Sequence, residues 1–354
     1  MTVPPSRPDP TPSPTTTPED LGAVAIGRNE GERLIRCLDS LAGKVARVVY
    51  VDSGSTDGSV EAARARGVEV VELDLSVPFT AARARNAGLD RLLELAPGLR
   101  YVQFVDGDCE LADGWLDRGR EALESRPELA VACGRRRERA PEASLYNRLA
   151  DLEWDTPVGD ADSCGGDAMM RVEALLGVGG YDPTLIAGEE PDLCLRLRAE
   201  GWKVARLDAE MTSHDLAMTR FGQWWRRLER AGHAYAEGAA RHAHRPGRPW
   251  ARQVASIAFW GLALPAAAIG LAWPTSGLSL SLLLGYPVIA ARAARGRMRR
   301  GTPVGQSALY GASCAVSKFP QAIGLLRYAG NRLLGRRGTL IEYKGVAGVG
   351  EAAR

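Results

Sequence analysis

The stretch VARVVYVDSGSTDGSVEAARARG, residues 45–67, combines a strand, a polar loop and a helix. Residues 45–52 are rich in β-branched side chains, which favour a strand. Residues 59–67 have a helical pattern that ends at Gly67, a residue that commonly terminates helices. The stretch therefore predicts one strand–loop–helix unit.

The same alternation repeats on both sides of this unit. Between Gly22 and Asp106, strand and helix alternate four times, which favours a parallel sheet with helices on both faces. We therefore predict an α/β fold, in which ligands bind at the carboxyl ends of the strands. Asp52 and Asp106 both end strands. The other predicted elements are strands at residues 22–27, 68–74 and 99–106 and helices at residues 31–43 and 80–96.

The composition is that of a globular protein. The 354 residues carry a net charge of +2, with 45% hydrophobic and 25% charged residues. This balance gives no electrostatic signature for nucleic acid, and we expect no nucleic-acid partner. The six cysteines form no CxxC motif, so free thiols are expected rather than a zinc site. Residues 1–20 are rich in Pro and Thr, lack the apolar core of a signal peptide, and are predicted to be disordered.

Two aspartates follow the strand that ends at residue 106. Asp106 and Asp108 flank Gly107 and can reach the same crevice. Crowded carboxylates have raised pKa values unless a cation neutralises them, and hard oxygen ligands suit Mg²⁺ or Mn²⁺ bound together with phosphates. The alternative is a polar turn in which Glu110 and Asp113 cap the next helix.

The loop VDSGSTDGS, residues 51–59, is a second candidate site. Asp52 and Ser53 begin a tight polar segment that can present N–H groups and hydroxyls to a nucleotide. It matches neither the P-loop nor the GxGxxG pattern. The alternative is an ordinary strand-to-helix turn with Asp57 as N-cap.

The segment GEEPDLCLRLR, residues 188–198, is a third candidate site. Glu189, Glu190 and Asp192 lie at the start of a predicted helix. Carboxylates at this position stabilise a helix through its dipole, or one of them can serve as a general base.

Taken in order, these segments resemble the motifs of family 2 glycosyltransferases, which are inverting enzymes with a GT-A fold. The resemblance covers roughly residues 22 to 240 and implies a Rossmann-like mixed sheet with helices on both faces. The loop 51–59 resembles the nucleoside-binding loop, FVDGD the metal-binding Asp-x-Asp, and GEEPDLCLRLR the catalytic Glu-Asp motif. The other matching segments are IGRNEGERL (26–34), AARARNAGL (81–89), GGDAMMRVEALLGVGGYD (165–182) and FGQWWRRLERAGHAY (221–235).

The resemblance also implies a role for each site residue. Arg85 would stabilise charge on the leaving diphosphate. Glu190 would take the place of the family's catalytic aspartate as the base, with Asp192 as the alternative and Glu189 beside it. The implied nucleotide-sugar contacts are Asn29, Glu30, Asp52, Ser53, Arg85 and Asp106. The implied ligands of the divalent cation, Mg²⁺ or Mn²⁺, are Asp108, Asp106 and His214.

The composition changes after residue 245. Residues 254–273 carry no charge over a length that can cross a bilayer, and residues 277–291 form a second uncharged run. We predict a membrane hairpin over about 254–291, rather than a buried core hairpin, followed by a basic loop at 292–302 that stays in the cytoplasm. Residues 304–326 predict a re-entrant or interfacial segment, which precedes a basic cytoplasmic tail.

These features predict a catalytic domain over residues 21–245 and a membrane-associated region over residues 246–354, at the cytoplasmic face of the inner membrane. The expected function is transfer of one sugar from a nucleotide-diphosphate sugar, a UDP-sugar in particular, to a lipid-linked or cell-surface glycan acceptor in polysaccharide biosynthesis. QWWRR (223–227) differs from the Gln-x-x-Arg-Trp pattern of processive synthases, which favours single transfer. The alternatives are a nucleotidyltransferase of similar fold and a catalytically silent subunit of a polysaccharide assembly complex.

Overall fold

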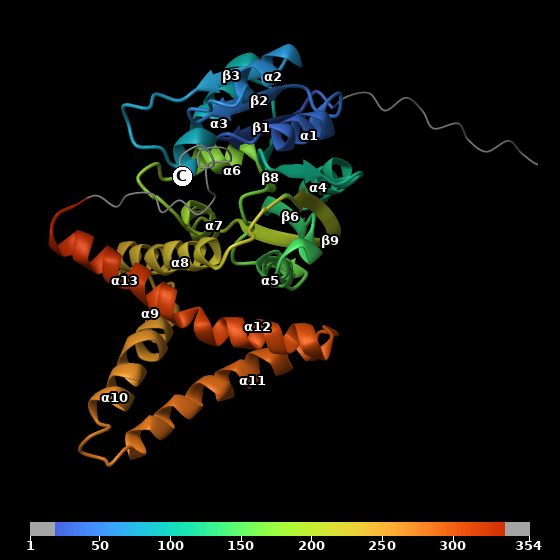
Figure 1. Ribbon diagram of the computed structural model, residues 1–354. Coiled ribbons are helices and arrows are strands. Elements are labelled where there is room, and N and C mark those ends of the chain that lie inside the picture. Colours follow the sequence, from blue (N-terminus) through green and yellow to red (C-terminus); the bar gives the residue numbers. More distant parts are fainter. Residues whose placement is uncertain (1–17, 337–354) are drawn as a thin grey trace, which may run out of the picture.

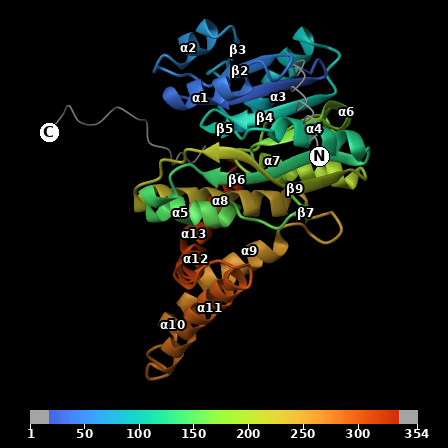
Figure 2. The ribbon, with the colours of Figure 1, turned by 90° about the vertical axis from the view of Figure 1, so that its right-hand side faces the viewer.

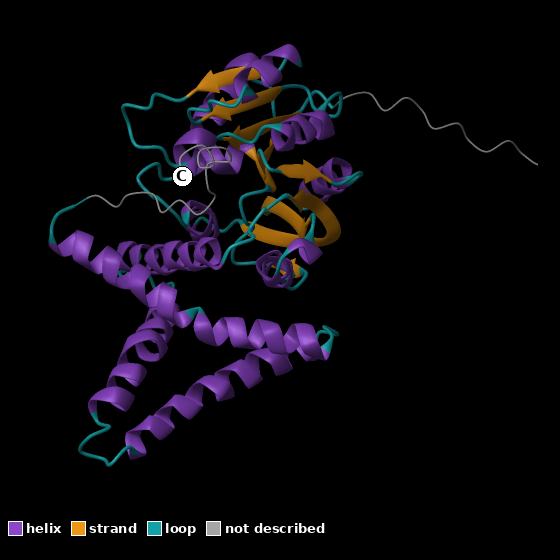
Figure 3. Cartoon of the chain, viewed as in Figure 1, coloured by secondary structure: helices purple, strands orange, loops and turns teal. Residues whose placement is uncertain are grey.

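The computed structural model describes residues 18–336, which form an α/β domain and a helical C-terminal region (Figure 1). Most of the segment predicted to be disordered lies outside the described residues, as do Arg337 and Lys344 of the predicted basic tail. Strands occur only in the α/β domain of this described part, and the region that follows it is helical (Figure 3).

A nine-stranded mixed sheet forms the centre of the domain. Its first four strands pair in parallel, as the alternating pattern predicts, whereas the fifth strand runs antiparallel to its neighbour. The parallel pairing predicted for residues 22–106 is therefore confirmed, and the sheet as a whole is mixed, as the resemblance implied. In spatial order the strands are β3 (Glu69–Glu72), β2 (Val48–Asp52), β1 (Leu21–Gly27), β4 (Tyr101–Asp106), β8 (Ala168–Arg171), β6 (Leu129–Glu138), β9 (Lys203–His214) and β5 (Cys109–Leu111), and β7 (Gly159–Asp160) pairs with β9.

Helices cover both faces of this sheet, as expected (Figures 1 and 2). Crossovers between parallel strands are right-handed, so α1 (Glu32–Leu41) and α2 (Ser59–Ala65) lie on one face and α3 (Ala81–Leu95) lies on the other. The apolar residues of β1, β2 and β4 are buried between these helices. The remaining helices of the domain are α4 (Trp115–Ser125), η1 (Pro141–Ala143), α5 (Leu145–Trp154), α6 (Val172–Gly177), α7 (Glu189–Ala199) and α8 (Phe221–Arg241).

The strand register brings the predicted site residues to one edge of the sheet. Gly27 at the end of β1 is level with Asp52 at the end of β2, and Ile26 is level with Asp106 at the end of β4. The order of the strands in the sheet reverses at this point, because β2 and β3 are added on one side of β1 and β4 is added on the other. Such an edge is where open α/β sheets bind ligands.

The C-terminal region is built from two diverging helical arms that meet at a distant tip (Figure 1). The first arm contains α9 (Ala251–Ala258), η2 (Phe259–Ala263) and α10 (Leu264–Gly270), and the second contains η3 (Leu278–Leu284) and α11 (Gly285–Met298). Trp273 at the tip is 93% exposed, so the alternative of a buried core hairpin is wrong. The prediction of a basic loop at 292–302 is wrong for residues 292–298, because these Ala- and Arg-rich residues belong to helix α11, which ends at Met298.

Among residues 18–336, one helix is long and apolar enough to cross a membrane. It is the first arm, Ala251–Gly270, and 22% of its most apolar window is buried. A second uncharged run forms the other arm, but it does not meet the same criteria of length and composition.

The segment predicted as re-entrant or interfacial forms parts of two helices, α12 (Val304–Val316) and α13 (Lys318–Leu333). Helix α12 packs on α11, and α13 packs along α8 of the α/β domain. The α8–α13 contact is very close: a Cβ atom at Gly232 would overlap the backbone of Gln321, and one at Gly324 would overlap the backbone of Glu229. Glycine at both positions allows the two helix backbones to touch. Whether this segment contacts a membrane stays a prediction.

Candidate functional site

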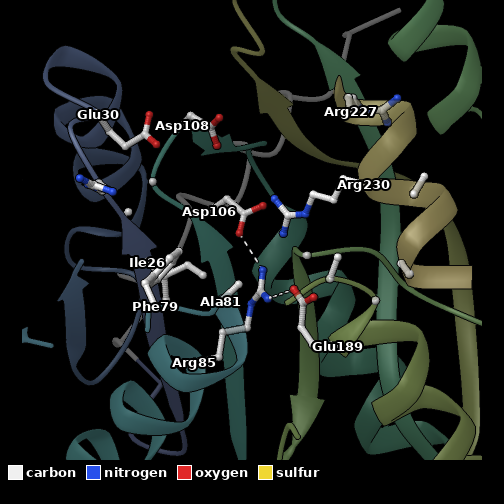
Figure 4. A pocket seen from close by; sticks show the side chains of 18 of the residues that line it. Ile26, Glu30, Phe79, Ala81, Arg85, Asp106, Asp108, Glu189, Arg227 and Arg230 are labelled. Atoms are coloured by element: carbon white, nitrogen blue, oxygen red, sulfur yellow. Dashed lines mark hydrogen bonds and ion pairs between the residues drawn. The ribbon is translucent and has the colours of Figure 1, made fainter. Parts of the chain in front are cut away.

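A cavity of about 480 Å³ opens at the carboxyl ends of β1 and β4 (Figure 4). Most of its walls come from the β1–α1 connection, the start of α3, the end of β4 and the residues after it, the start of α7, and α8, and Gln321 of α13 also lines it. Among the predicted site residues, the ones that line this cavity are Asn29, Glu30, Arg85, Asp106, Asp108 and Glu189.

Arg85 is the buried centre of this site. Its Nη2 atom donates to Asp106 Oδ1 and its Nη1 atom donates to Glu189 Oε1, both at 2.8 Å (Figure 4). Burial alone would lower the pKa of the guanidinium, but Asp106 and Glu189 together raise that pKa above its ordinary value. Arg85 is therefore a permanent positive charge between two carboxylates, at a place where a diphosphate can compete for it.

Asp106 is held by residues that the sequence did not single out. Its backbone N–H donates to Asp167 Oδ1 at 2.9 Å, and Arg136 Nη2 lies 2.8 Å from Asp167 Oδ2 and 3.7 Å from Asp106 Oδ2. Thr212 also donates to Asp167. Asp167 is fully buried, so this network is a rigid support for Asp106.

Asp108 and His214 lie together beside Asp106. His214 Nε2 is 3.1 Å from Asp108 Oδ2, and both side chains are buried. Burial lowers the pKa of His214, but the carboxylates of Asp108 and Glu138 raise it above its ordinary value overall. Glu110 and Asp113 do not cap α4, because Glu110 belongs to β5 and pairs with Arg139 while Asp113 pairs with Lys44. The polar-turn alternative is therefore wrong.

The donor atoms around Asp108 fit a divalent cation. Asp108 and His214, with Cys109, offer ligand atoms within 4.8 Å of one another. A carboxylate oxygen and an imidazole nitrogen suit Mn²⁺, and the carboxylate suits Mg²⁺. His214 Nδ1 is buried without a hydrogen-bond partner within residues 18–336 and lies 3.8 Å from Glu138 Oε2. The carboxylate of Asp106, in contrast, faces Arg85 and Arg136.

The three acidic residues at the start of α7 point to different surroundings. Glu189 lines the cavity. Glu190 Oε1 accepts from the backbone N–H of Cys164 and from the Cys194 thiol at 3.3 Å, and Glu190 is not a cavity-lining residue. Asp192 is buried between Arg196 and His242, at 2.9 and 2.7 Å. The structure therefore brings Glu189, and neither of the other two, to the cavity.

The predicted nucleoside loop is held together by its own polar groups. Asp52 Oδ1 accepts from the Tyr50 hydroxyl, and Asp52 Oδ2 accepts from the N–H groups of Gly54 and Ser55, all at 2.8 Å. Asn29 Oδ1 accepts from Thr56 N–H at 2.7 Å. Asp52 and the buried Ser53 thus shape the loop, whereas Asn29 also reaches the cavity.

Glu30 in the β1–α1 connection and Asp57 in the loop 51–59 have further contacts. Glu30 lines the cavity and pairs with Arg33 at 2.9 Å. Asp57 is not the N-cap of α2, which is Gly58, although Asp57 Oδ1 accepts from the Ser59 N–H.

Arginines on α8 form the wall of the cavity that faces the acidic residues. Arg227 and Arg230 extend from this helix, across the cavity from Glu30 and Asp108 (Figure 4). Arg227 pairs with Glu153 at 2.6 Å, and Arg230 donates to the Ile186 carbonyl at 3.3 Å. The arginines of α8 therefore face Glu30 and Asp108 across the cavity.

Two sequence signals point to the residues that were missed. Asp167 lies in the segment 165–182, which resembles a motif of family 2 glycosyltransferases, and Arg136 lies in a run of three arginines near the end of a buried strand. Alternation along a strand sends successive side chains to opposite faces, so one arginine of the run had to point toward the site.

The chain is similar to known glycosyltransferases. It is 28% identical over 180 residues to the succinoglycan biosynthesis protein ExoA of Rhizobium meliloti, covering 46% of this chain and 52% of that protein. It is 29% identical over 239 residues to the pre-mycofactocin glycosyltransferase of Mycobacterium tuberculosis, covering 63% and 48%. The matches thus span about half the length of these curated relatives.

Two solved structures share the fold at low sequence identity. The mannosyltransferase PcManGT of Pyrobaculum calidifontis, solved with GDP-Man and Mn²⁺, has a TM-score of 0.58 at 20% identity, covering 87% of this chain and 90% of that chain. S. aureus TarS has a TM-score of 0.50 at 13% identity, covering 90% and 92%. These likenesses confirm the GT-A-like α/β fold. The family model for Glycosyl transferase family 2 matches residues 25–175, a segment that lies within the α/β domain.

Proposed function

We propose that this protein transfers a single sugar, with inversion, from a nucleotide-diphosphate sugar to a hydroxyl group of a lipid-linked acceptor. The observation that carries the proposal is the arrangement of Arg85 between Asp106 and Glu189 at the wall of one cavity, with Asp108 close by. A cation site, a diphosphate-binding arginine and a carboxylate base would then share one space.

The donor would bind along the acidic side of the cavity. Asn29 and Glu30 would contact the nucleoside, Asp106 the ribose, and Arg85 the diphosphate. Asp108 and His214 would hold a divalent cation, and when bound this ion neutralises charge on the diphosphate. Support for this binding mode comes from the mannosyltransferase of similar fold, whose structure contains GDP-Man and Mn²⁺. We retain a UDP-sugar as the expected donor.

Glu189 is the carboxylate we propose as the base, in place of the Glu190 implied by the family motif, because Glu189 lines the cavity and Glu190 faces Cys164 and Cys194. As charge develops on the leaving diphosphate, Arg85 would turn toward the phosphate oxygens and release Glu189. Glu189 would then accept the proton of the acceptor hydroxyl while the hydroxyl oxygen attacks the anomeric carbon opposite the diphosphate.

The C-terminal arms would anchor the protein in the inner membrane, with the catalytic domain in the cytoplasm. The first arm is long enough to span, and the arginines of α11 lie at the end of the second arm that contacts the domain. Arg297 on α11 pairs with Asp155 at 3.0 Å. Because basic residues stay on the cytoplasmic side, the domain would stay there with them.

The proposed function is tested with a panel of nucleotide sugars. Full-length protein in neutral detergent is incubated with each sugar nucleotide, Mn²⁺ and a lipid extract, and release of the nucleoside diphosphate is measured. We expect one donor to be consumed in a lipid-dependent way. Release of pyrophosphate from a nucleoside triphosphate instead would favour a nucleotidyltransferase, and no binding of any donor would favour a silent subunit.

A further inference from the structure

A second cavity, of about 320 Å³, lies directly beside the catalytic cavity. It is enclosed by α8, α9 and α13, and the two cavities share Tyr235 and Gln321 as lining residues. The two cavities therefore adjoin at Tyr235 and Gln321. The second cavity is in a position to extend the proposed acceptor site.

The charged residues that line this second cavity are both cations, Arg252 and Lys318. Neither of them forms an ion pair with a carboxylate anywhere in residues 18–336. In the catalytic cavity, by contrast, Arg85 and Arg227 each pair with a carboxylate. Two cations in one recess without an anionic partner attract an anion, and a phosphate group accepts hydrogen bonds from both.

An unsatisfied polar atom lies at the junction of the two cavities. Gln321 Oε1 is buried and has no hydrogen-bond partner among the described residues. A buried acceptor without a donor is costly and calls for a ligand that supplies one. The backbone of Gln321 is held firmly, because it touches Gly232 of α8. A ligand hydroxyl that passes from one cavity to the other would find this oxygen in a defined position.

The cavity also lies at the polar end of the apolar arm. Ser256 and Ile257 line it from α9, and the uncharged run from Phe259 to Gly270 follows immediately. In a protein anchored by that arm, a recess at this position lies at the depth of the lipid headgroups. An acyl or prenyl chain can then run along the arm while its phosphate stays in the cavity.

We propose that the cavity between α8, α9 and α13 binds the phosphate headgroup of an amphiphilic acceptor, with Arg252 and Lys318 as its ligands and Gln321 as the contact for the group that continues into the catalytic cavity. The inference rests on the proposed transfer to a lipid-linked acceptor and names the acceptor's class: a lipid that carries phosphate. The arginines of α8 would contact the part of the acceptor that enters the catalytic cavity.

Direct binding tests this assignment without any turnover. Full-length protein in dodecyl maltoside is titrated calorimetrically with dodecyl phosphate, and in parallel with inorganic phosphate. We expect saturable binding of dodecyl phosphate and much weaker binding of inorganic phosphate. Equal affinity for the two probes, or no binding of dodecyl phosphate, would overturn the proposal.

Variants locate the site. Arg252→Met and Lys318→Met should each weaken binding of dodecyl phosphate roughly tenfold or more, since each removes a charged hydrogen-bond donor, whereas Lys318→Arg should retain most of the affinity. Arg295→Met is the matched control, because Arg295 is exposed on α11 and lines neither cavity. An equal loss in the control would show a nonspecific charge effect and overturn the site.

Nucleotide-sugar binding, measured on the same samples, separates this inference from the function it rests on. If the donor binds and dodecyl phosphate does not, the inference fails and the transferase function stands. If dodecyl phosphate binds at Arg252 and Lys318 and no donor binds, the proposed function fails and the phosphate site stands. Thermal unfolding of each variant confirms that loss of binding does not result from loss of folding.

Discussion

The guanidinium of Arg85 lies 2.8 Å from the carboxylate of Glu189, although 104 residues separate them in the chain. The contact joins α3 to α7 and places a cation beside the proposed base. The same guanidinium contacts Asp106, so a single side chain connects the proposed donor half of the site with the proposed acceptor half.

Turnover should fall even when Arg85 is replaced by another cationic residue. Arg85→Lys keeps the charge but cannot hold two partners in a fixed fork. We expect turnover to fall by about 10²–10³-fold, as for the loss of one preorganised donor to a developing charge. Steady-state release of nucleoside diphosphate measures this. Arg91→Lys, on the exposed side of the same helix and paired only at the surface, should keep normal turnover; a comparable loss there would point to a general defect of α3.

Glu189 and Glu190 should give different phenotypes. Glu189→Gln should lower transfer by about 10²–10⁴-fold, the usual effect of losing a general base, while donor affinity and thermal stability change little. Glu190→Gln keeps an acceptor for the Cys164 N–H and should retain much more activity, with a lower unfolding temperature, because a buried carboxylate with set partners is replaced. Glu200→Gln at the exposed end of α7 is the control. The opposite ranking of the two variants would return the role of base to Glu190.

Cation binding should depend on Asp108. We expect Asp108→Asn to weaken Mn²⁺ binding at least tenfold, and His214→Ala to weaken it less, since the charged ligand contributes more than the neutral one. Electron paramagnetic resonance of free Mn²⁺ measures both affinities, and a chelator should abolish donor turnover in the unmodified protein. Asp113→Asn, fully exposed in the following turn, should leave Mn²⁺ affinity unchanged. An unaltered affinity in Asp108→Asn would remove this residue from the site.

The contact between α8 and α13 predicts a strong difference between two glycines of the same helix. Gly324→Ala places a methyl group against the backbone of Glu229 and should destabilise the protein by about 1–3 kcal/mol through overpacking. Gly330→Ala meets nothing within 4 Å and should stabilise it by up to about 1 kcal/mol, because alanine is the better helix former. Thermal unfolding compares the two. Equal effects would mean that α13 does not pack on α8 as described.

Acid should lower the stability of the protein through protonation of His233, which lies at the contact between α8 and α13. Burial, with Arg327 nearby, lowers the pKa of His233 from 6.5 to about 4. Because the folded-state pKa lies below the unfolded one, the stability contributed by neutral His233 is complete above about pH 6.5 and is lost as the pH falls toward 4. The loss should reach roughly 2–3 kcal/mol. Unfolding temperatures measured from pH 7 to pH 4 should fall less steeply in His233→Gln, whereas the exposed control His244→Gln should follow the unmodified protein.

Local pattern was enough to predict the strand ends and the acidic clusters. Asp52 and Asp106 follow β-branched or apolar runs, and alternation with helices places such ends along one sheet edge. The mixed second half of the sheet, in which β8 runs antiparallel to its neighbours and β6 pairs in parallel with β9, was not visible in the same way, because these strands pair with partners far along the chain.

The side chains that complete the site depend on packing that no short segment contains. Which glutamate of α7 faces the cavity depends on the rotation of the helix, and the buried residues Leu193 and Leu197 fix that rotation by packing into the core. Arg136 and Asp167 meet only because β6 and β8 are neighbours. The second cavity, between α8, α9 and α13, exists only because α13 packs back against α8.

The apolar arms are joined to the α/β domain at two separate places. Helix α13 packs along α8, and Arg297 of α11 pairs with Asp155. A domain on a single tether would swing over the bilayer and sample many heights and tilts. If the protein is anchored as proposed, the two attachment points would hold the cavity at one height and in one orientation above the bilayer. Its encounter with acceptors would then be a search in two dimensions, restricted to molecules whose reactive hydroxyl lies at that height, and the length of the acceptor headgroup would be a criterion of selection.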